Sequence, residues 1–311
     1  MSTFASGEPA HHPVKRALAP WKLTAEVYML FLTLKELPQD VHDELEGEMG
    51  GWNDEGKGVF EGGLGTVVVI RYKDTPVGPY DELLLAPGKF TVPQLTATSS
   101  THAHVKIPQK AQRISRIYVS QRTTTYNGRL NWNIPKHLAR FSFSSPPTPP
   151  GGSPPSSLTV QVFPPGTKEG GGGAPFFACT LKPWKWVPPI PLNTKYLPLS
   201  LAAAQPPLPA ALGHEEDVRE VLGGLEVDEY DLSPQKEAAV LVGTERWRAF
   251  DIAAVTPRAR GCWVEVHESK EGEVVEESGK RWWPRGLGEW SVGAWMEDVD
   301  WKLGEVVEWT V

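Results

Sequence analysis

Residues 66–72 read TVVVIRY, and this stretch decides the fold class. Its nearly continuous run of apolar, β-branched residues is typical of a strand that is buried on both faces. Residues 26–34 (EVYMLFLTL) before it and residues 113–120 (RISRIYVS) after it are also rich in strand-forming residues. The sequence around this stretch therefore predicts a fold in which strands dominate.

More strand-like segments follow, and they lie at residues 138–143, 158–163, 176–181, 238–242 and 263–267. Helical patterns are confined to residues 39–48 and 215–222. Because the strands come without regular intervening helices, we do not expect a parallel sheet built from alternating strands and helices. We predict a mainly β (α+β) fold: an antiparallel β-barrel, closed or partly closed, with a few peripheral helices and long Pro/Gly-rich loops.

Proline and glycine mark the loops of this fold. Residues 145–157 (SPPTPPGGSPPSS) and residues 164–175 (PPGTKEGGGGAP) contain too few apolar residues to pack, and a third such stretch covers residues 202–217. The first two flank a predicted strand, so they read as expanded connections rather than domain linkers. We predict a disordered tail at residues 1–18 and a single domain over residues 19–311.

Composition excludes several functional classes. The 311 residues carry a net charge of −7 and no long basic run, so we expect no nucleic-acid partner. No apolar run approaches the roughly 18 residues of a membrane span, and the N-terminus lacks the pattern of a signal peptide. We expect a cytoplasmic protein with no membrane partner. The two cysteines, Cys179 and Cys262, are expected to be reduced and buried, and they do not form a zinc motif.

Lys136 is the candidate nucleophile, within residues 127–141 (NGRLNWNIPKHLARF). Pro135 fixes its own φ and pushes the preceding residue toward an extended conformation, which gives the lysine a rigid mount at the entrance of a strand. Trp132 and Leu138 are apolar neighbours, and a lysine desolvated among such residues would have a lowered pKa. A neutral amine can attack a ketone, and the protonated imine that results accepts electrons from a breaking carbon–carbon bond.

Three segments, in order, resemble acetoacetate decarboxylases. Residues 128–141 are similar to the GRE…PKK…G/A segment of that family, and residues 76–82 (PVGPYDE) are similar to its Gly-x-Tyr-x-Glu stretch. Residues 19–23 (APWKL) resemble its opening proline-aromatic segment. The resemblance covers roughly residues 19–200, and it implies the barrel of the acetoacetate decarboxylase-like type.

The resemblance also implies roles for individual residues. Lys136 would be the Schiff-base lysine and Glu82 the active-site carboxylate, which orients the substrate or moves protons. Tyr80, within the same motif, and Trp132 would contact the substrate. No metal and no cofactor are implied, and the pair His102 and His104 lacks the partners that a metal site needs.

The sequence departs from the family pattern at three places. His137 stands where the family has a second lysine, and it is either a general acid–base group or a residue that faces away from Lys136. Glu26 stands at the place of a substrate-binding arginine, and Val67 at that of an acid. The arginines that could supply a cation instead are Arg71, Arg122 and Arg129. Arg129 is favoured because it belongs to the Gly-Arg pair.

These features predict a lysine-dependent lyase that works through an imine. The simplest reaction is decarboxylation of a β-keto acid, and the missing charges suggest a larger, less charged keto substrate of the secondary-metabolite kind. An imine-dependent aldolase, dehydratase or cyclase remains an alternative, as does a non-catalytic barrel that binds a small molecule. We expect a homo-oligomer, because exposed tryptophan-rich strands favour assembly.

Overall fold

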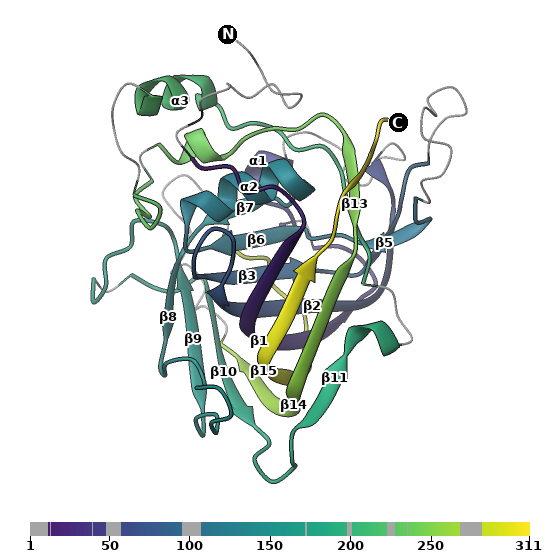
Figure 1. Ribbon diagram of the computed structural model, residues 1–311, viewed down its shortest axis with the longest axis vertical. Helices are drawn as coiled ribbons and strands as arrows, with labels where there is room; N and C mark the ends of the chain where they lie inside the picture. Colours follow the sequence, from purple (N-terminus) through teal and green to yellow (C-terminus); the bar gives the residue numbers. More distant parts are fainter. Residues whose placement is uncertain are drawn as a thin grey trace.

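The computed structural model contains one extensive sheet and few helices (Figure 1). It describes residues 12, 14–38, 40–47, 57–94, 107–171, 173–197, 201–222, 228–234, 236–267 and 282–311. The strands are β1 (Trp21–Leu34), β2 (Phe60–Asp74), β3 (Tyr80–Ala86), β4 (Lys89–Thr91), β5 (Lys110–Gln112), β6 (Arg116–Val119), β7 (Lys136–Leu138), β8 (Arg140–Phe143), β9 (Leu158–Phe163), β10 (Phe177–Pro183), β11 (Ile190–Asn193), β12 (Ala203–Gln205), β13 (Trp247–Phe250), β14 (Ile252–Val266), β15 (Val292–Leu303) and β16 (Val307–Trp309). The helices are α1 (Glu44–Gly47), α2 (Arg122–Trp132) and α3 (His214–Leu222), with the short 3-10 helices η2 (Thr194–Tyr196) and η3 (Glu237–Val240).

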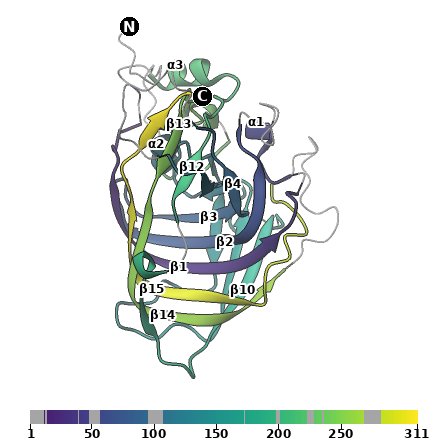
Figure 2. The same cartoon turned by 90° about the vertical axis from the view of Figure 1, so that its right-hand side faces the viewer.

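The strands pair in the order β16-β13-β12-β5-β4-β2-β1-β15-β14-β10-β9-β8. Off this path, β11 pairs with β14, while β3 joins β2 to β6 and β6 pairs with β7. Long, curved strands β1, β2, β14 and β15 lie side by side, with α2 and α3 at one end of the molecule (Figure 2). The prediction of a mainly β, mostly antiparallel fold with few helices is confirmed.

One unit of this sheet is parallel, against expectation. β6 and β7 run parallel and are joined by α2, so the chain contains one strand–helix–strand unit within an otherwise mostly antiparallel sheet. The parallel pairing between β5 and β12 is the other exception among the described strands. The sheet is therefore mixed, because a parallel neighbour needs a crossover and α2 supplies it.

Helix α2 was not predicted, because its sequence has no amphipathic pattern. All its residues are buried, although RTTTYNGRLNW is mostly polar. Gln121 caps the first turn by accepting a hydrogen bond from Thr124 N, and Asn133 ends the helix in the left-handed conformation at φ 55°. Pro135 follows two residues later. Polar side chains are satisfied by tertiary contacts, so periodicity could not reveal this helix.

Other element predictions differ in detail. The expected strand at residues 238–242 is mostly the 3-10 helix η3, and its apolar residues Val240 and Val242 are buried against α2 rather than in a sheet. The expected helix at residues 39–48 shortens to α1 in the described part, while the helix at 215–222 is present as α3. The stretch 202–217, expected to be a loop, includes β12 and the start of α3. Of the predicted tail, residues 1–11 and 13 lie outside the described residues.

Alternation along the strands gives the sheet two apolar faces. One face carries Val27, Ile70, Tyr80 and Val119, and we call it the lysine face because Lys136 belongs to it. The opposite face carries Tyr28, Val69, Leu83 and Tyr118, and we call it the histidine face because His137 belongs to it. Adjacent residues of one strand therefore lie in different environments.

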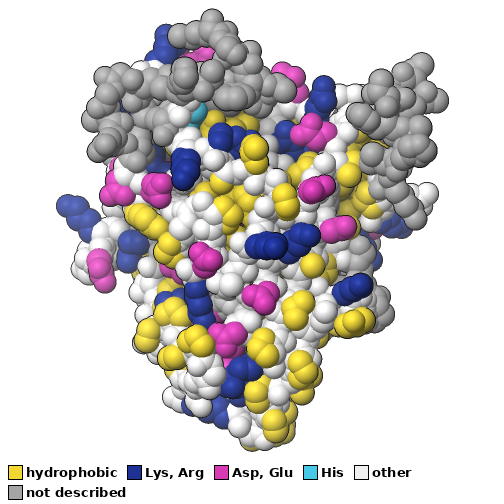
Figure 3. All heavy atoms as spheres, viewed as in Figure 1, with side chains coloured by type: hydrophobic (Ala, Val, Ile, Leu, Met, Phe, Trp, Pro, Cys, Tyr) yellow, Lys and Arg dark blue, Asp and Glu magenta, His cyan; other side chains and the backbone are white. Residues whose placement is uncertain are grey.

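The surface is mixed in character. On the side shown in Figure 3, charged side chains of both signs lie among apolar ones. The strands β11 and β14 carry the exposed apolar residues Ile190, Val255 and Trp263. Among the described residues, no helix is long and apolar enough to cross a membrane. The homo-oligomer expected from the sequence stays a prediction.

Glu26 connects the proline-rich loop at residues 145–157 to the sheet. Its carboxylate is fully buried and accepts hydrogen bonds from Thr148 N at 2.8 Å, Thr148 Oγ1 at 2.6 Å and Trp295 Nε1 at 2.8 Å. A buried carboxylate is tolerated when several donors replace its hydration. The loop is thereby held against β1 and β15 although it contains few apolar residues.

Replacing Glu26 with alanine should lower the free energy of unfolding by about 3 kcal/mol, because three buried donors lose their acceptor. Urea denaturation measures this loss. Glu265→Ala, at an exposed position of β14, is the matched control and should change little. A loss below about 0.5 kcal/mol for Glu26→Ala would contradict the structural role.

Candidate active site

Lys136 is the first residue of β7, and its side chain is only 2% exposed. Its Nζ donates to Glu82 Oε2 at 2.8 Å, to Thr124 Oγ1 at 2.9 Å and to Tyr80 OH at 3.3 Å. An ammonium group has three donors, and here each has an acceptor. The nucleophile candidate therefore lies in a buried polar cluster within the apolar lysine face, and we call the side chains of Lys136, Glu82, Thr124 and Tyr80 the lysine pocket.

Strand register explains how these groups meet. Glu82 pairs with Ile70 on β2 and with Val119 on β6, and Lys136 pairs with Ile117, two positions before Val119. Residues two apart on a strand point to the same face, so Glu82 and Lys136 face the same side.

Two tyrosines line the pocket beside Glu82. Tyr72 pairs with Tyr80 across β2 and β3, and their rings lie 4.5 Å apart. Tyr72 OH donates to Glu82 Oε1 at 3.3 Å, so each carboxylate oxygen has a donor. Burial is the main cause that raises the pKa of both phenols, and nearby Glu82 raises them further. Both tyrosines are thus neutral hydroxyl donors at physiological pH.

Helix α2 covers the lysine from the other side. It contributes Thr124, and its Gly128 lies directly against the lysine stem. A Cβ at Gly128 would stand 2.7 Å from Lys136 Cδ and 2.8 Å from Cε. Only glycine lets the helix approach this closely without moving the lysine.

Electrostatics correct one expectation from the sequence. Burial, the largest influence, lowers the pKa of Lys136, but Glu82 and Tyr80 together outweigh burial and raise it. The sequence showed the apolar neighbours but not the carboxylate 2.8 Å away. The resting site therefore holds an ammonium–carboxylate pair rather than a neutral amine.

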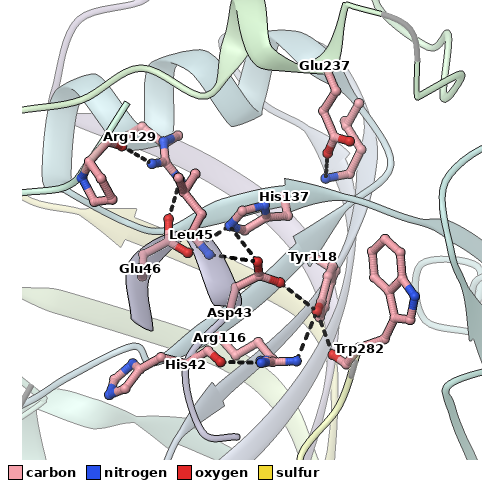
Figure 4. Close-up of polar contacts among 12 residues, drawn as sticks. His42, Asp43, Leu45, Glu46, Arg116, Tyr118, Arg129, His137, Glu237 and Trp282 are labelled. Carbon is pink, nitrogen blue, oxygen red and sulfur yellow. Dashed lines mark hydrogen bonds and ion pairs between the residues drawn. The ribbon is translucent and has the colours of Figure 1, made fainter. Parts of the chain in front are cut away.

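His137 points away from Lys136, onto the histidine face, where it enters a buried polar cluster (Figure 4). Its Nε2 lies 2.9 Å from Glu46 Oε2 and 4.0 Å from Asp43 Oδ1. Arg129 Nη1 donates to the other oxygen of Glu46 at 2.8 Å. Tyr118 OH contacts Asp43 Oδ2 at 3.4 Å and donates to Trp282 O at 2.5 Å.

Charges within this cluster compensate one another. Burial opposes the charged form of His137, but Asp43 and Glu46 outweigh burial and raise its pKa. Burial likewise opposes the charge of Glu46, but His137 and Arg129 prevail and lower its pKa. Two carboxylates thus face the guanidinium of Arg129 and the imidazole of His137, whose charged form they favour.

Asp43, Glu46 and His137 offer ligand atoms within 4.8 Å of one another, which are ligand types that a metal ion accepts. Arg129 already donates to Glu46, however, and His137 hydrogen-bonds to it. A divalent ion would have to displace the imidazole proton and lie beside a guanidinium, so the cluster fits a charge-paired network better than a metal centre.

Two other predicted site residues, Arg129 and Trp132, contact groups other than Lys136. Arg129 is held by Glu46, Val242 O and Pro209 O. Trp132 packs against Trp21 and Phe250 and donates its indole N–H to Gly304 O.

Strand alternation separates Glu26 from Lys136. Glu26 pairs with Arg71, whereas the neighbouring pair of Val27 and Ile70 belongs to the lysine face. Glu26 therefore lies on the histidine face, where it contacts Thr148 and Trp295. It does not meet the lysine, although the sequence placed it among the substrate contacts.

The remaining candidate cations are also engaged elsewhere. Arg71 stacks on Phe143 and donates to Ser145 O. Arg122 donates to the carbonyls of Asp231, Ser233 and Lys236. The described hydrogen bonds of these two arginines and of Arg129 are thus made to groups other than Lys136, Glu82 and Tyr80.

Sequence reasoning missed Tyr72, Thr124, Asp43 and Glu46. Tyr72 lies on the same face of β2 as Ile70. Its contact with Glu82 depends on the register between β2 and β3, which the sequence does not give. Thr124 could not be assigned to the site because helix α2, which carries it, was not predicted. The acids of the cluster come from a segment whose sequence offers no motif, and only the fold brings them to His137.

Comparison with known proteins gives matches among solved structures, while no family profile and no curated protein matches the chain. The acetoacetate decarboxylase of Legionella pneumophila aligns over 99% of this chain and 93% of its own, with a TM-score of 0.51 and 11% identity. A second acetoacetate decarboxylase structure aligns over 96% and 91%, with a TM-score of 0.53 and 10% identity. An acetoacetate decarboxylase-like enzyme from Sphingomonas wittichii RW1 aligns over 99% of both chains, with a TM-score of 0.51 and 10% identity.

These matches extend over nearly the whole chain at very low identity. At such identities they establish the fold and leave the chemistry to the residues of the site. The resemblance read from the sequence is confirmed at that level. The chain has the acetoacetate decarboxylase-like fold, with a strongly divergent sequence.

Proposed function

We propose that this protein is an imine-forming lyase in which Lys136 Nζ attacks the carbonyl carbon of a small keto substrate. The observation that carries the proposal is the buried contact of Lys136 with Glu82, Thr124 and Tyr80. A buried lysine with a carboxylate and two hydroxyl groups in reach has the groups that imine formation requires. The shared fold with acetoacetate decarboxylases supports the same reaction class by analogy.

The first step is a proton transfer inside the ion pair. As a ketone enters, Lys136 passes a proton to Glu82, and the amine lone pair bonds to the carbonyl carbon. The carbonyl oxygen takes up the proton from Glu82, and the attached nitrogen then gives one of its two protons back to Glu82, which leaves a neutral carbinolamine. Loss of that hydroxyl as water, with the proton that Glu82 returns, leaves a protonated imine on Lys136. Glu82 thus serves as base and then as acid.

The second step breaks a carbon–carbon bond. In a β-keto acid, the electrons of the bond to the carboxylate move into the protonated imine, carbon dioxide leaves, and an enamine remains. Protonation of the enamine carbon and hydrolysis of the imine then release the ketone and restore Lys136. A substrate carboxylate would lie near Glu82, and its departure as neutral carbon dioxide removes that like-charge repulsion.

The positions of the arginines favour a second candidate reaction at the same site. Arg71, Arg122 and Arg129 are all engaged away from the lysine pocket. A less charged substrate, such as a β-diketone or a β-hydroxy ketone, needs no such cation. An aldolase or dehydratase reaction through the same imine is therefore the catalytic alternative. A barrel that binds a ketone without reaction is the non-catalytic alternative.

Borohydride reduction tests the imine directly. The protein is incubated with β-keto acids or β-diketones, reduced, and digested for mass spectrometry. We expect a covalent adduct on Lys136, which Lys136→Ala abolishes together with turnover. Lys182→Ala, at an exposed lysine of β10, is the matched control and should keep both. Turnover that survives Lys136→Ala would refute the assignment, and a Lys136 adduct without any product would favour the binding barrel.

Glu82→Gln separates the two effects of the carboxylate. Because Glu82 raises the pKa of Lys136 and burial lowers it, removing the charge should lower the pKa of the amine. The variant should nevertheless lose about 10²- to 10⁴-fold in kcat, because its acid–base group is gone. The pH dependence of adduct formation gives the pKa, and turnover gives kcat. A raised amine pKa or an unchanged kcat would contradict the role of Glu82.

Gly128→Ala tests the fit of helix α2 on the lysine. The added methyl group meets Cδ and Cε of Lys136, so Nζ must move away from its partners. We expect kcat to fall by about 10- to 100-fold, since small displacements of a reacting group are costly. Stability should change little, because alanine favours a helix over glycine. An unchanged kcat in a folded variant would show that Nζ tolerates the shift.

A further inference from the structure

Glu46 connects the two elements that build the lysine pocket, although it lies on the opposite face of the sheet. Its Oε1 accepts from Arg129 Nη1 of α2 at 2.8 Å, and its Oε2 lies 2.9 Å from His137 Nε2 of β7. All three side chains are buried, with Glu46 and Arg129 fully inaccessible. One carboxylate thus bridges a helix and a strand (Figure 4).

Both bridged elements hold groups of the lysine pocket. β7 begins with Lys136, the residue before His137. α2 carries Arg129 next to Gly128, which touches the lysine stem, and it carries Thr124, which accepts from Nζ. A change in the distance between α2 and β7 therefore changes the position of Nζ relative to its partners.

Among the described strands, β7 has a backbone partner on one side. It is three residues long, and among the described strands it pairs only with β6. The N–H of Leu138 donates to Glu237 Oε1 of η3 at 3.2 Å, which is a further side-chain support. A short strand at a sheet margin depends strongly on side-chain contacts for its position.

We propose that Glu46 is a positioning residue for the reaction of Lys136: through Arg129 and His137 it holds α2 against β7 from the histidine face and so fixes Nζ against Thr124 and Glu82. This inference rests on the proposed imine chemistry for its consequence in catalysis. The contacts of Glu46 with Arg129 and His137 do not depend on that chemistry. Glu46 acts on the reaction through Arg129 and His137 rather than on the substrate.

The groups around the bridge support a charged form of His137. Asp43 and Glu46 come from the segment of α1, Arg129 from α2, and Tyr118 from β6, where Arg116 also contacts Tyr118 OH at 3.4 Å. Arg129 is one positive partner of these carboxylates, and the two carboxylates favour the protonated form of His137 as the other. The bridge is thus a pair of charge-assisted hydrogen bonds, which are stronger than neutral ones.

Competitive labelling of the whole protein with acetic anhydride tests the bridge without any substrate. Peptide mass spectrometry compares the acetylation rate of Lys136 with that of exposed Lys182 in the same molecule, across a range of pH. Glu46→Gln keeps the shape and removes the charge. We expect the relative rate of Lys136 to rise at least about tenfold, and its pH midpoint to fall toward the ordinary lysine value of about 10.4 as Nζ separates from Glu82.

Glu297→Gln is the matched control. Glu297 is a buried glutamate of β15 that is paired with Arg258 and Arg260, so the chemical change and the loss of ion pairs are alike. It should leave the labelling of Lys136 and its pH midpoint unchanged, whatever it does to stability. Urea denaturation of both variants separates local loosening from global unfolding. Equal labelling of Lys136 in wild type and Glu46→Gln, or an equal rise in both variants, would overturn the proposal.

The catalytic consequence has its own measurement. In borohydride trapping, Glu46→Gln should form the Lys136 adduct about tenfold more slowly at saturating ketone, with the half-saturating concentration unchanged. If wild type forms no adduct with any ketone, the imine proposal fails while the labelling still decides the bridge. If wild type forms the adduct and Glu46→Gln matches its rate, the positioning role fails alone. Tight zinc binding by wild type that His137→Gln abolishes would also overturn the bridge, because the imidazole would then be a metal ligand.

Discussion

The parallel pairing of β6 with β7 is the constraint on which the site depends. It places Ile117 opposite Lys136 and Tyr118 opposite His137, so two adjacent residues of one short strand enter different faces of the sheet. The crossover through α2 brings a buried polar helix onto the lysine. With an antiparallel neighbour there would be no crossover, and Thr124 and Gly128 would not reach Nζ.

Burial and charge act against each other at both faces. Burial lowers the pKa of Lys136, but Glu82 and Tyr80 outweigh burial and raise it. His137 and Glu46 show the same balance on the other side. A buried ion pair adds little stability by itself, since desolvation opposes the attraction, yet losing one partner leaves a costly charge. In the lysine pocket such a pair also stores a proton that can move when a ketone arrives.

The sequence predicted the elements whose signal is local. The apolar run at residues 66–72 became β2, and the proline before Lys136 did mark the entrance of β7. The motif residues Glu82 and Tyr80 were placed beside Lys136 by resemblance, and the structure gives the distances. Helix α2 was missed because its polar residues are satisfied by distant partners such as Lys15 O, which leave no periodic pattern. Arg129 was assigned to the substrate because it belongs to the Gly-Arg pair, and Glu26 because it stands at the place of a substrate-binding arginine. In the structure, Arg129 contacts Glu46 and Glu26 contacts Thr148 instead.

Exchange of carbonyl oxygen between a simple methyl ketone and heavy-oxygen water tests the central claim most directly. An imine on Lys136 must release the ketone oxygen as water and take it back from solvent on hydrolysis, whichever carbon–carbon bond the natural substrate breaks. The structure predicts exchange catalysed by wild type and by Lys182→Ala, and no catalysed exchange by Lys136→Ala. Catalysed exchange that persists in Lys136→Ala, or its absence in wild type with every ketone tried, would contradict an imine-forming role for Lys136.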